Sequence, residues 1–87
     1  MRAPRDIFAD VLILRGFSVV GVTETEVRLS HPSIDDIHRV EVTDERFRLV
    51  NMMRRWDGGE SPDCIAGDII PGYVESQASG LCDMFGI

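Results

Sequence analysis

The fold of this chain is decided by one stretch, Asp6-Ile7-Phe8-Ala9-Asp10-Val11-Leu12-Ile13-Leu14-Arg15-Gly16-Phe17-Ser18-Val19-Val20-Gly21-Val22. At about 100° per residue, the apolar residues of its first half that share one arc of a helix are Ile7, Phe8, Val11, Leu12 and Leu14. Asp6, Ala9 and Asp10 fall outside that arc. This spacing predicts an amphipathic helix at about residues 4–15, whose apolar side must cover another part of the chain.

Gly16 is predicted to end this helix, because a residue without a Cβ adopts the left-handed backbone conformation at little cost. After it the apolar period changes to two, which indicates a strand over residues 17–23. Ser18, Val20 and Val22 share one side of this strand. We predict that the helix covers this side, so that helix and strand form two layers of one core.

A second strand, from Glu26 to His31, is predicted to fold back on the first as a hairpin. In this pairing Val22 lies beside Val27. Val20 lies beside Leu29, so that the apolar residues of both strands share the covered face.

A third strand is predicted from Ile37 to Val42, which completes an antiparallel meander. Val40 and Val42 belong to its covered face. Arg39 and Glu41 lie on the opposite face, which no helix covers in this arrangement.

Residues 44–56 fit two structures. As a helix, the segment has acidic residues in its first turn and arginines in its last, so that each charge matches the helix dipole. As a strand, residues 46–50 pair back on the third strand, with Glu41 facing Arg48. Two pairs of adjacent apolar residues break a period of two, and we therefore favour the helix.

These elements predict an α+β fold in a single domain, because 87 residues do not support two cores. The N-terminal helix packs on a three-stranded antiparallel meander, or on a four-stranded one if residues 46–50 form a strand, and a second helix follows the sheet. Residues 1–57 form this α-β-β-β-α core domain. Residues 58–87 form an acidic, glycine-rich tail that packs on the core or is available to a partner, with a short helix near Val74 to Asp83.

Charge is distributed unevenly along the chain. Residues 1–55 hold all nine arginines and nine acidic residues, so the net charge of −6 comes from the rest. An acidic tail attracts basic surfaces and repels nucleic acid, and we expect the partner to be another protein with a basic surface. The longest apolar run is too short to span a bilayer, and residues 1–20 lack the order of a signal peptide. We therefore expect a cytoplasmic protein with no membrane partner.

Leu14-Arg15-Gly16-Phe17, followed by Ser30-His31-Pro32 at the end of the second strand, resembles the HicA ribonuclease toxins. Those toxins share the order helix, three strands, helix with double-stranded-RNA-binding domains, and the resemblance covers about residues 6–56. A glycine, a serine and a catalytic histidine open their second strand, and the matching positions here are Glu24-Thr25-Glu26. A carboxylate beside a turn does not replace the imidazole near neutral pH, so the resemblance implies the fold without the chemistry.

The uncovered face of the sheet offers a first candidate binding site. Arg28 and Arg39 stand on neighbouring strands, where two guanidiniums can hold a phosphate in bidentate fashion. The alternatives are a solvated face on which Glu41 neutralises one of them, or a face that the tail covers.

A second candidate is the segment Arg54-Arg55-Trp56-Asp57-Gly58-Gly59, because tryptophan and arginine are enriched in binding hot spots. The alternative is that Trp56 closes the core under the second helix. Further along the tail, the acidic residues expected to meet a basic partner are Glu60, Asp63 and Asp68.

Metal binding and thiol catalysis are not predicted. The residue types that suit zinc are His31, His38, Cys64 and Cys82. Six residues separate the two histidines and seventeen the two cysteines, whereas zinc ligands come in close pairs. Each cysteine adjoins an aspartate, which suppresses the thiolate, and we expect free thiols, no catalytic residue, no metal and no cofactor.

The sequence thus favours a non-enzymatic protein-binding module, by analogy a small inhibitor such as the anti-CRISPR proteins that phages direct against host defence. The alternative is an RNA-binding or catalytically degenerate HicA-like ribonuclease domain. The oligomeric state is left open, with a homodimer among the options.

Overall fold

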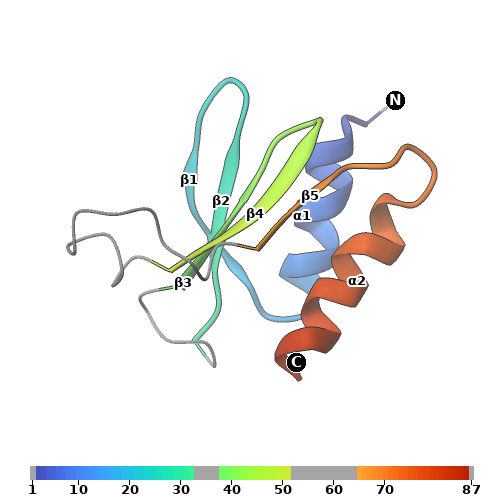
Figure 1. Cartoon of the computed structure of the whole chain (residues 1–87). Helices are drawn as coiled ribbons and strands as arrows, with labels where there is room; N and C mark the ends of the chain where they lie inside the picture. Colours follow the sequence, from blue (N-terminus) through green and yellow to red (C-terminus); the bar gives the residue numbers. More distant parts are fainter. Residues whose placement is uncertain (1, 33–37, 52–64, 87) are drawn as a thin grey trace.

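Figure 1 shows the computed structural model, which describes residues 2–32, 38–51 and 65–86. In chain order its elements are α1 (Pro4–Leu14), β1 (Ser18–Val22), β2 (Val27–Ser30), β3 (His38–Val42), β4 (Arg46–Asn51), β5 (Ile65–Asp68) and α2 (Val74–Phe85). The five strands form one sheet in the order β1-β2-β3-β4-β5, and every neighbouring pair is antiparallel. Both helices lie on the same side of the sheet, with α2 alongside α1 (Figure 1). The predicted α+β class is confirmed, with five strands instead of three or four.

α1 buries a stripe that is shifted around the helix from the predicted one, towards Ala9 and away from Leu14. Phe8 and Leu12 are fully buried, as predicted. Ala9, predicted to lie outside the apolar arc, is buried as well, and Leu14, predicted to lie inside it, is 86% exposed. The reason is that α1 packs against α2 as well as against β2 and β3, so its contact surface is not a single arc that faces the sheet.

The centre of the covered face is the one predicted. Four buried side chains from β2 and β3 form it: Val27, Leu29, Val40 and Val42. They face the helices because side chains alternate across a strand, which sends Arg28, Arg39 and Glu41 to the open face. Period two therefore defines both faces of these strands.

β1 departs from the prediction. Val22 pairs with the predicted residue of β2, but the register shifts between Val19 and Gly21, so that Leu29 lies opposite Val19. Val20 and Val22 are 57% and 68% exposed, and the prediction that α1 covers them is wrong. The bulge changes which residues face the helices, and α1 lies over β2 and β3, further into the sheet.

β4 is a strand, so the helix favoured over residues 44–56 is wrong in the part that the structure describes, and the alternative strand is correct. The hydroxyl oxygen of Thr43 accepts hydrogen bonds from the N–H groups of Glu45 (3.2 Å) and Arg46 (3.0 Å). Its own N–H donates to the carbonyl of Arg46 at 2.7 Å. A threonine that caps a helix accepts the same two hydrogen bonds through its hydroxyl, so this local signal does not distinguish a hairpin from a helix. The bond from its N–H to Arg46 forms only in the hairpin. The rest of the predicted helix lies outside the described residues.

β5 joins the sheet through a close approach to an aromatic ring. Gly67 lies opposite Phe47, and a Cβ built on it would be 2.7 Å from Phe47 Cζ. The ring of Phe47 also stacks on Phe8 of α1, with centroids 5.1 Å apart. Gly67 thus lets β5 pass beneath the ring that connects the sheet to α1.

α2 confirms the short helix predicted near Val74 to Asp83 and extends it to Phe85. The residues that it adds to the core are Val74, Ala78, Leu81 and Cys82. The core cluster therefore combines side chains from the predicted core domain, residues 1–57, with side chains from the predicted tail, residues 58–87. The division point itself lies outside the described residues.

Candidate functional site

The outer edge of β1 is open in the part of the chain that the structure describes. β1 stands first in the strand order, and β2 pairs with its other side. The N–H of Thr23 donates to the carbonyl of Glu26 at 2.8 Å, so these two residues form a hydrogen-bonded pair next to the turn. Because such pairs alternate in an antiparallel ladder, the N–H and C=O of Val22 point away from β2. They face the open edge.

The side chains of this edge are apolar and exposed. Val19, Val20 and Val22 are 45%, 57% and 68% exposed, and β1 contains no charged residue and no proline. Edge strands are normally protected by charged residues, prolines or bulges, because unpaired backbone groups attract another strand. The bulge at Val20 is the protective feature that β1 has. Charge enters only at the turn beyond the strand, where Glu24 is exposed and Glu26 is partly buried.

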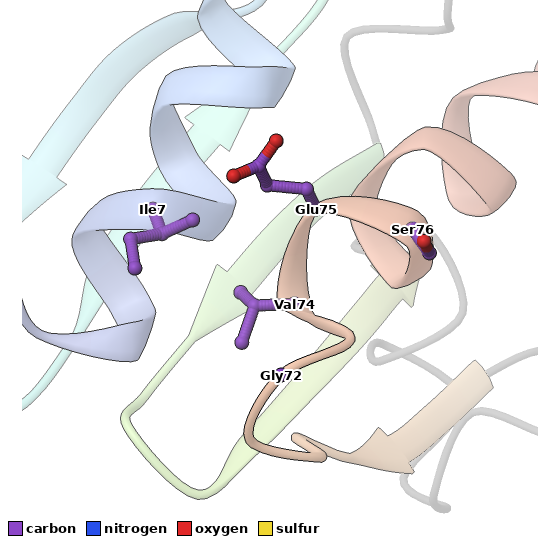
Figure 2. A pocket seen from close by; sticks show the side chains of 5 residues that line it. All are labelled: Ile7, Gly72, Val74, Glu75 and Ser76. Atoms are coloured by element: carbon purple, nitrogen blue, oxygen red, sulfur yellow. The ribbon is translucent and has the colours of Figure 1, made fainter.

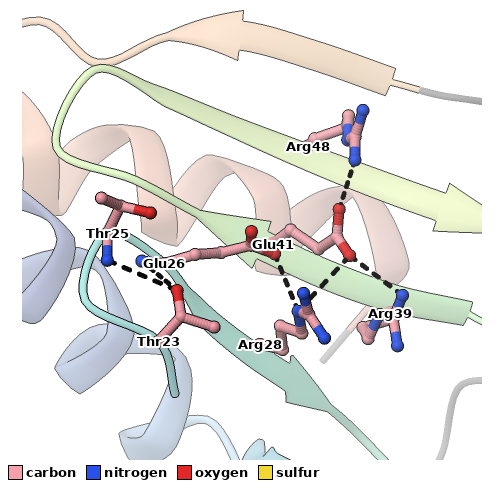
Figure 3. A network of polar contacts seen from close by, with 7 residues as sticks. All are labelled: Thr23, Thr25, Glu26, Arg28, Arg39, Glu41 and Arg48. Atoms are coloured by element: carbon pink, nitrogen blue, oxygen red, sulfur yellow. Dashed lines mark hydrogen bonds and ion pairs between the residues drawn. The ribbon is translucent and has the colours of Figure 1, made fainter. Parts of the chain in front are cut away.

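The open face carries a second group of polar residues, which we name the Glu41 cluster: Glu41, Arg28, Arg39 and Arg48, joined by Glu26 (Figure 3). Glu41 Oε1 accepts from Arg48 Nη2 at 2.5 Å. Its other oxygen, Oε2, is 3.0 Å from Arg39 Nη2 and 3.9 Å from Arg28 Nε. The predicted positions of Arg28 and Arg39 on the open face are therefore observed.

Glu41 is buried although it stands on the open face, with a relative exposure of 7%. Burial alone raises the pKa of its carboxyl. The hydrogen bond from Arg48 and the charges of Arg48, Arg39 and Arg28 outweigh burial, so the pKa of Glu41 lies below its ordinary value of 4.5. The carboxylate is thus charged at neutral pH and is held by its neighbours.

Arg28 has a second acidic partner, because its Nε also donates to Glu26 Oε1 at 3.0 Å. Three arginines and two glutamates therefore share one cluster, which leaves an excess of one positive charge. The contact between Glu41 and Arg39 is the one expected in the alternative in which Glu41 neutralises one of the two arginines. The cluster provides little attraction for a polyanion such as RNA.

Asp68, predicted to meet a basic partner, lies opposite Arg46 on the open face, and the two form an ion pair at 3.7 Å. Both side chains are more than three quarters exposed, so the pair contributes little to stability. The backbone of this segment is tied to α2, because Gln77 Nε2 donates to the carbonyl of Asp68 at 2.7 Å.

The remaining predicted binding residues lie outside the described residues, and their placement stays a prediction: Arg54, Arg55, Trp56, Asp57, Glu60 and Asp63. Cys64 lies outside them as well.

His31 has a structural role. Its Nε2 donates to the carbonyl of Arg15 at 2.9 Å, and its ring meets Phe17 edge-on, with centroids 5.0 Å apart. Gly16, at φ +102°, leaves space for the His31 ring, because a Cβ at this position would lie 2.7 Å from His31 Nε2. Residues 14–17 and 30–32 thus contact each other and join the end of α1 to the end of β2.

Cys82 is a free thiol with no exposed surface. Burial raises the pKa of this thiol, Arg15 lowers it in part and Asp83 adds to the rise. A neutral, inaccessible thiol does not serve as a nucleophile. Within the described ranges, no three residues among histidine, cysteine, aspartate and glutamate are placed to hold a metal ion.

A hollow of about 350 Å³ opens between the first turns of the two helices (Figure 2). The residues that line it are Ile7, Gly72, Val74, Glu75 and Ser76. Glu75 is the one ionisable side chain in this lining, so the hollow lacks the converging polar groups that a ligand site requires.

Sequence reasoning missed the β1 edge. The signal that marks it is Val19-Val20-Gly21-Val22, where adjacent valines break the period of two and a glycine within a strand indicates a bulge. A strand of this kind fits an edge better than the centre of a sheet.

No family model, no curated protein and no solved structure matches the chain. The resemblance to HicA-like proteins therefore stays a prediction. Among the residues that the structure describes, no helix has the length and apolarity needed to cross a membrane.

Proposed function

We propose that this protein is a non-enzymatic module that binds another protein, whose extended segment adds a strand to β1. One observation carries the proposal: an edge strand with exposed valines and without charged side chains turns the backbone N–H and C=O of Val22 outward. Strand addition uses these backbone groups for affinity and the alternating side chains for specificity. The exposed valines provide apolar contact to side chains of the added strand.

The charge of the chain favours a basic partner. The net charge is −6, and the exposed Glu24 stands at the hairpin turn that ends β1. A partner segment with apolar residues along the strand and a basic residue beside the turn complements this edge. A module that binds without chemistry acts by covering a surface of its target, and by analogy we propose a small inhibitor of the anti-CRISPR type.

The experiment compares the wild-type protein with the double variant Val20→Lys, Val22→Lys. Both valines are more than half exposed, so the lysines are compatible with the fold, and charged residues on an edge block strand addition. Ile70→Lys, Met84→Lys is the matched control, because it places the same two charges on residues outside β1 that are also more than half exposed. Each protein is immobilised and exposed to extract of the source cells, and the captured protein is purified and its affinity measured.

We expect a captured protein whose affinity falls at least about tenfold in the double variant and is unchanged in the control. Hydrogen exchange of the Val22 amide is expected to slow in the complex, since the added strand accepts from it. Equal affinity for all three proteins overturns the proposal, and so does an unprotected Val22 amide. Self-association of the chain through β1 would be detected for the same three proteins as a sedimentation coefficient that rises with protein concentration.

A further inference from the structure

The Glu41 cluster holds more hydrogen-bond donors than the described residues accept. Arg28 contacts its acidic neighbours through Nε, and Arg39 contacts Glu41 through Nη2. Arg39 Nε is buried and has no hydrogen-bond partner within the described part of the chain. A guanidinium carries five N–H donors in a planar fork. Within the described residues, the terminal nitrogens of Arg28 and the second terminal nitrogen of Arg39 therefore have N–H groups that no acidic neighbour of the cluster accepts.

The two guanidiniums lie side by side. Arg28 Nε and Arg39 Nη2 are within 3.9 Å and 3.0 Å of the same oxygen, Glu41 Oε2. In Figure 3 both side chains lie on one side of Glu41, and Arg48 lies on the other. Glu41 thus counteracts the repulsion between two like charges and fixes their relative position before any ligand arrives.

From this geometry we propose that Arg28 and Arg39 form a binding site for a single phosphate group, with Glu41 as the positioning residue. The cluster retains one positive charge, which matches an anion of low charge and does not match a polyanion. The tetrahedral oxygens of phosphate accept from two guanidinium forks at different angles, whereas acetate offers two oxygens in a single plane. The site is independent of the β1 edge.

The test uses inorganic phosphate as the probe, with acetate as the planar comparison, both at constant ionic strength. The readout is the NMR signal of each arginine Nε–H in the labelled protein. We expect the signals of Arg28 and Arg39 to shift along saturable curves with phosphate and to shift less with acetate. Arg46 is the internal control, because it stands on the same face, is mostly exposed and lies outside the cluster.

Two charge-preserving variants distinguish a specific phosphate site from general electrostatic attraction of anions. Arg28→Lys and Arg39→Lys keep the charge and remove the fork, and each is expected to weaken phosphate binding at least about tenfold. Arg46→Lys is expected to leave the affinity unchanged. Linear shifts without saturation, equal shifts at Arg46, or unchanged affinity in both cluster variants would each overturn the proposal. Backbone spectra show whether the variants keep the fold, and either cluster variant alone suffices for the test.

Discussion

Replacing Glu41 by glutamine is expected to destabilise the protein strongly, although the residue lies on the open face of the sheet. The change preserves shape and removes the charge that Arg28, Arg39 and Arg48 surround. Removing one partner of a buried ion pair costs about 3–5 kcal/mol, because the other charge is left without compensation. The three arginine side chains keep between 23% and 51% exposure, so water replaces part of the lost interaction. We therefore expect the free energy of unfolding of Glu41→Gln to be about 1–3 kcal/mol lower than that of the wild type at pH 7.

The pH dependence of this loss follows from the direction of the pKa shift. The pKa of Glu41 is lowered in the folded protein, so its carboxylate stabilises the fold above the ordinary value of 4.5. This contribution is lost as the pH falls through the lower pKa of the folded state. The difference in stability between the wild type and Glu41→Gln is therefore full at neutral pH and shrinks in acid below about pH 4.5.

Thermal and urea unfolding at several pH values measure this effect. A domain of this size changes its melting temperature by about 4–8 °C for each kcal/mol, so the variant melts roughly 5–20 °C lower at pH 7. Glu24→Gln is the matched control, since it makes the same change on an exposed turn. A Glu41→Gln variant as stable as the control at pH 7, or a difference that persists undiminished in strong acid, would refute the reasoning.

Two further predictions concern packing around a glycine and a buried thiol. Gly67→Ala is expected to lower the free energy of unfolding by about 1–3 kcal/mol in urea, because the new Cβ meets the Phe47 ring at 2.7 Å. Gly80→Ala, at a helix position with nothing within 4 Å, is the matched control and is expected to raise it by up to about 1 kcal/mol. A Gly67→Ala protein as stable as the wild type contradicts the close approach. Cys82 is expected to react with a thiol reagent in the folded protein at a small fraction of its rate in denaturant, because it is buried and its pKa is raised. Equal rates in the two states would show that the thiol is accessible.

The covered centre of the sheet could be predicted from sequence because it depends on local periodicity. Val27, Leu29, Val40 and Val42 alternate with polar residues, and a period of two is visible within five residues of a strand. The same alternation places Arg28 and Arg39 on the open face. Periodicity gives the side of the sheet on which a residue stands, and it does not give the depth at which the residue is buried.

The identity of β4 could not be predicted in this way, because two elements compete with the same local signals. Thr43 offers its hydroxyl to backbone N–H groups in a turn or in a helix cap. Pairing decides the outcome: β4 bonds to β3 on one side and to β5 on the other. Since β4 ends at Asn51 and β5 begins only at Ile65, this second pairing is non-local and leaves no trace in the composition of residues 44–51.

Burial of Glu41 depends on the same pairing. Arg48 reaches Glu41 because the two lie opposite each other on β4 and β3. If residues 46–50 formed a helix, Arg48 would not be placed there. The Glu41 cluster was therefore predictable as far as Arg28 and Arg39, and its third arginine depended on the strand that the sequence did not favour.

The distribution of charge explains why a protein partner would gain more binding free energy from the β1 edge than from the open face. Covering the Glu41 cluster with a protein surface removes water from several charged groups that already satisfy one another, and this desolvation opposes binding. Val20 and Val22 have no such penalty and still expose more than half of their surface. Complete burial of a valine contributes about 1.5–3 kcal/mol, so burying the exposed part of both contributes on the order of 2–3 kcal/mol, to which the backbone hydrogen bonds of Val22 add. A partner strand on β1 thus gains apolar contact and backbone pairing without disturbing the charged cluster, which remains available to a small anion.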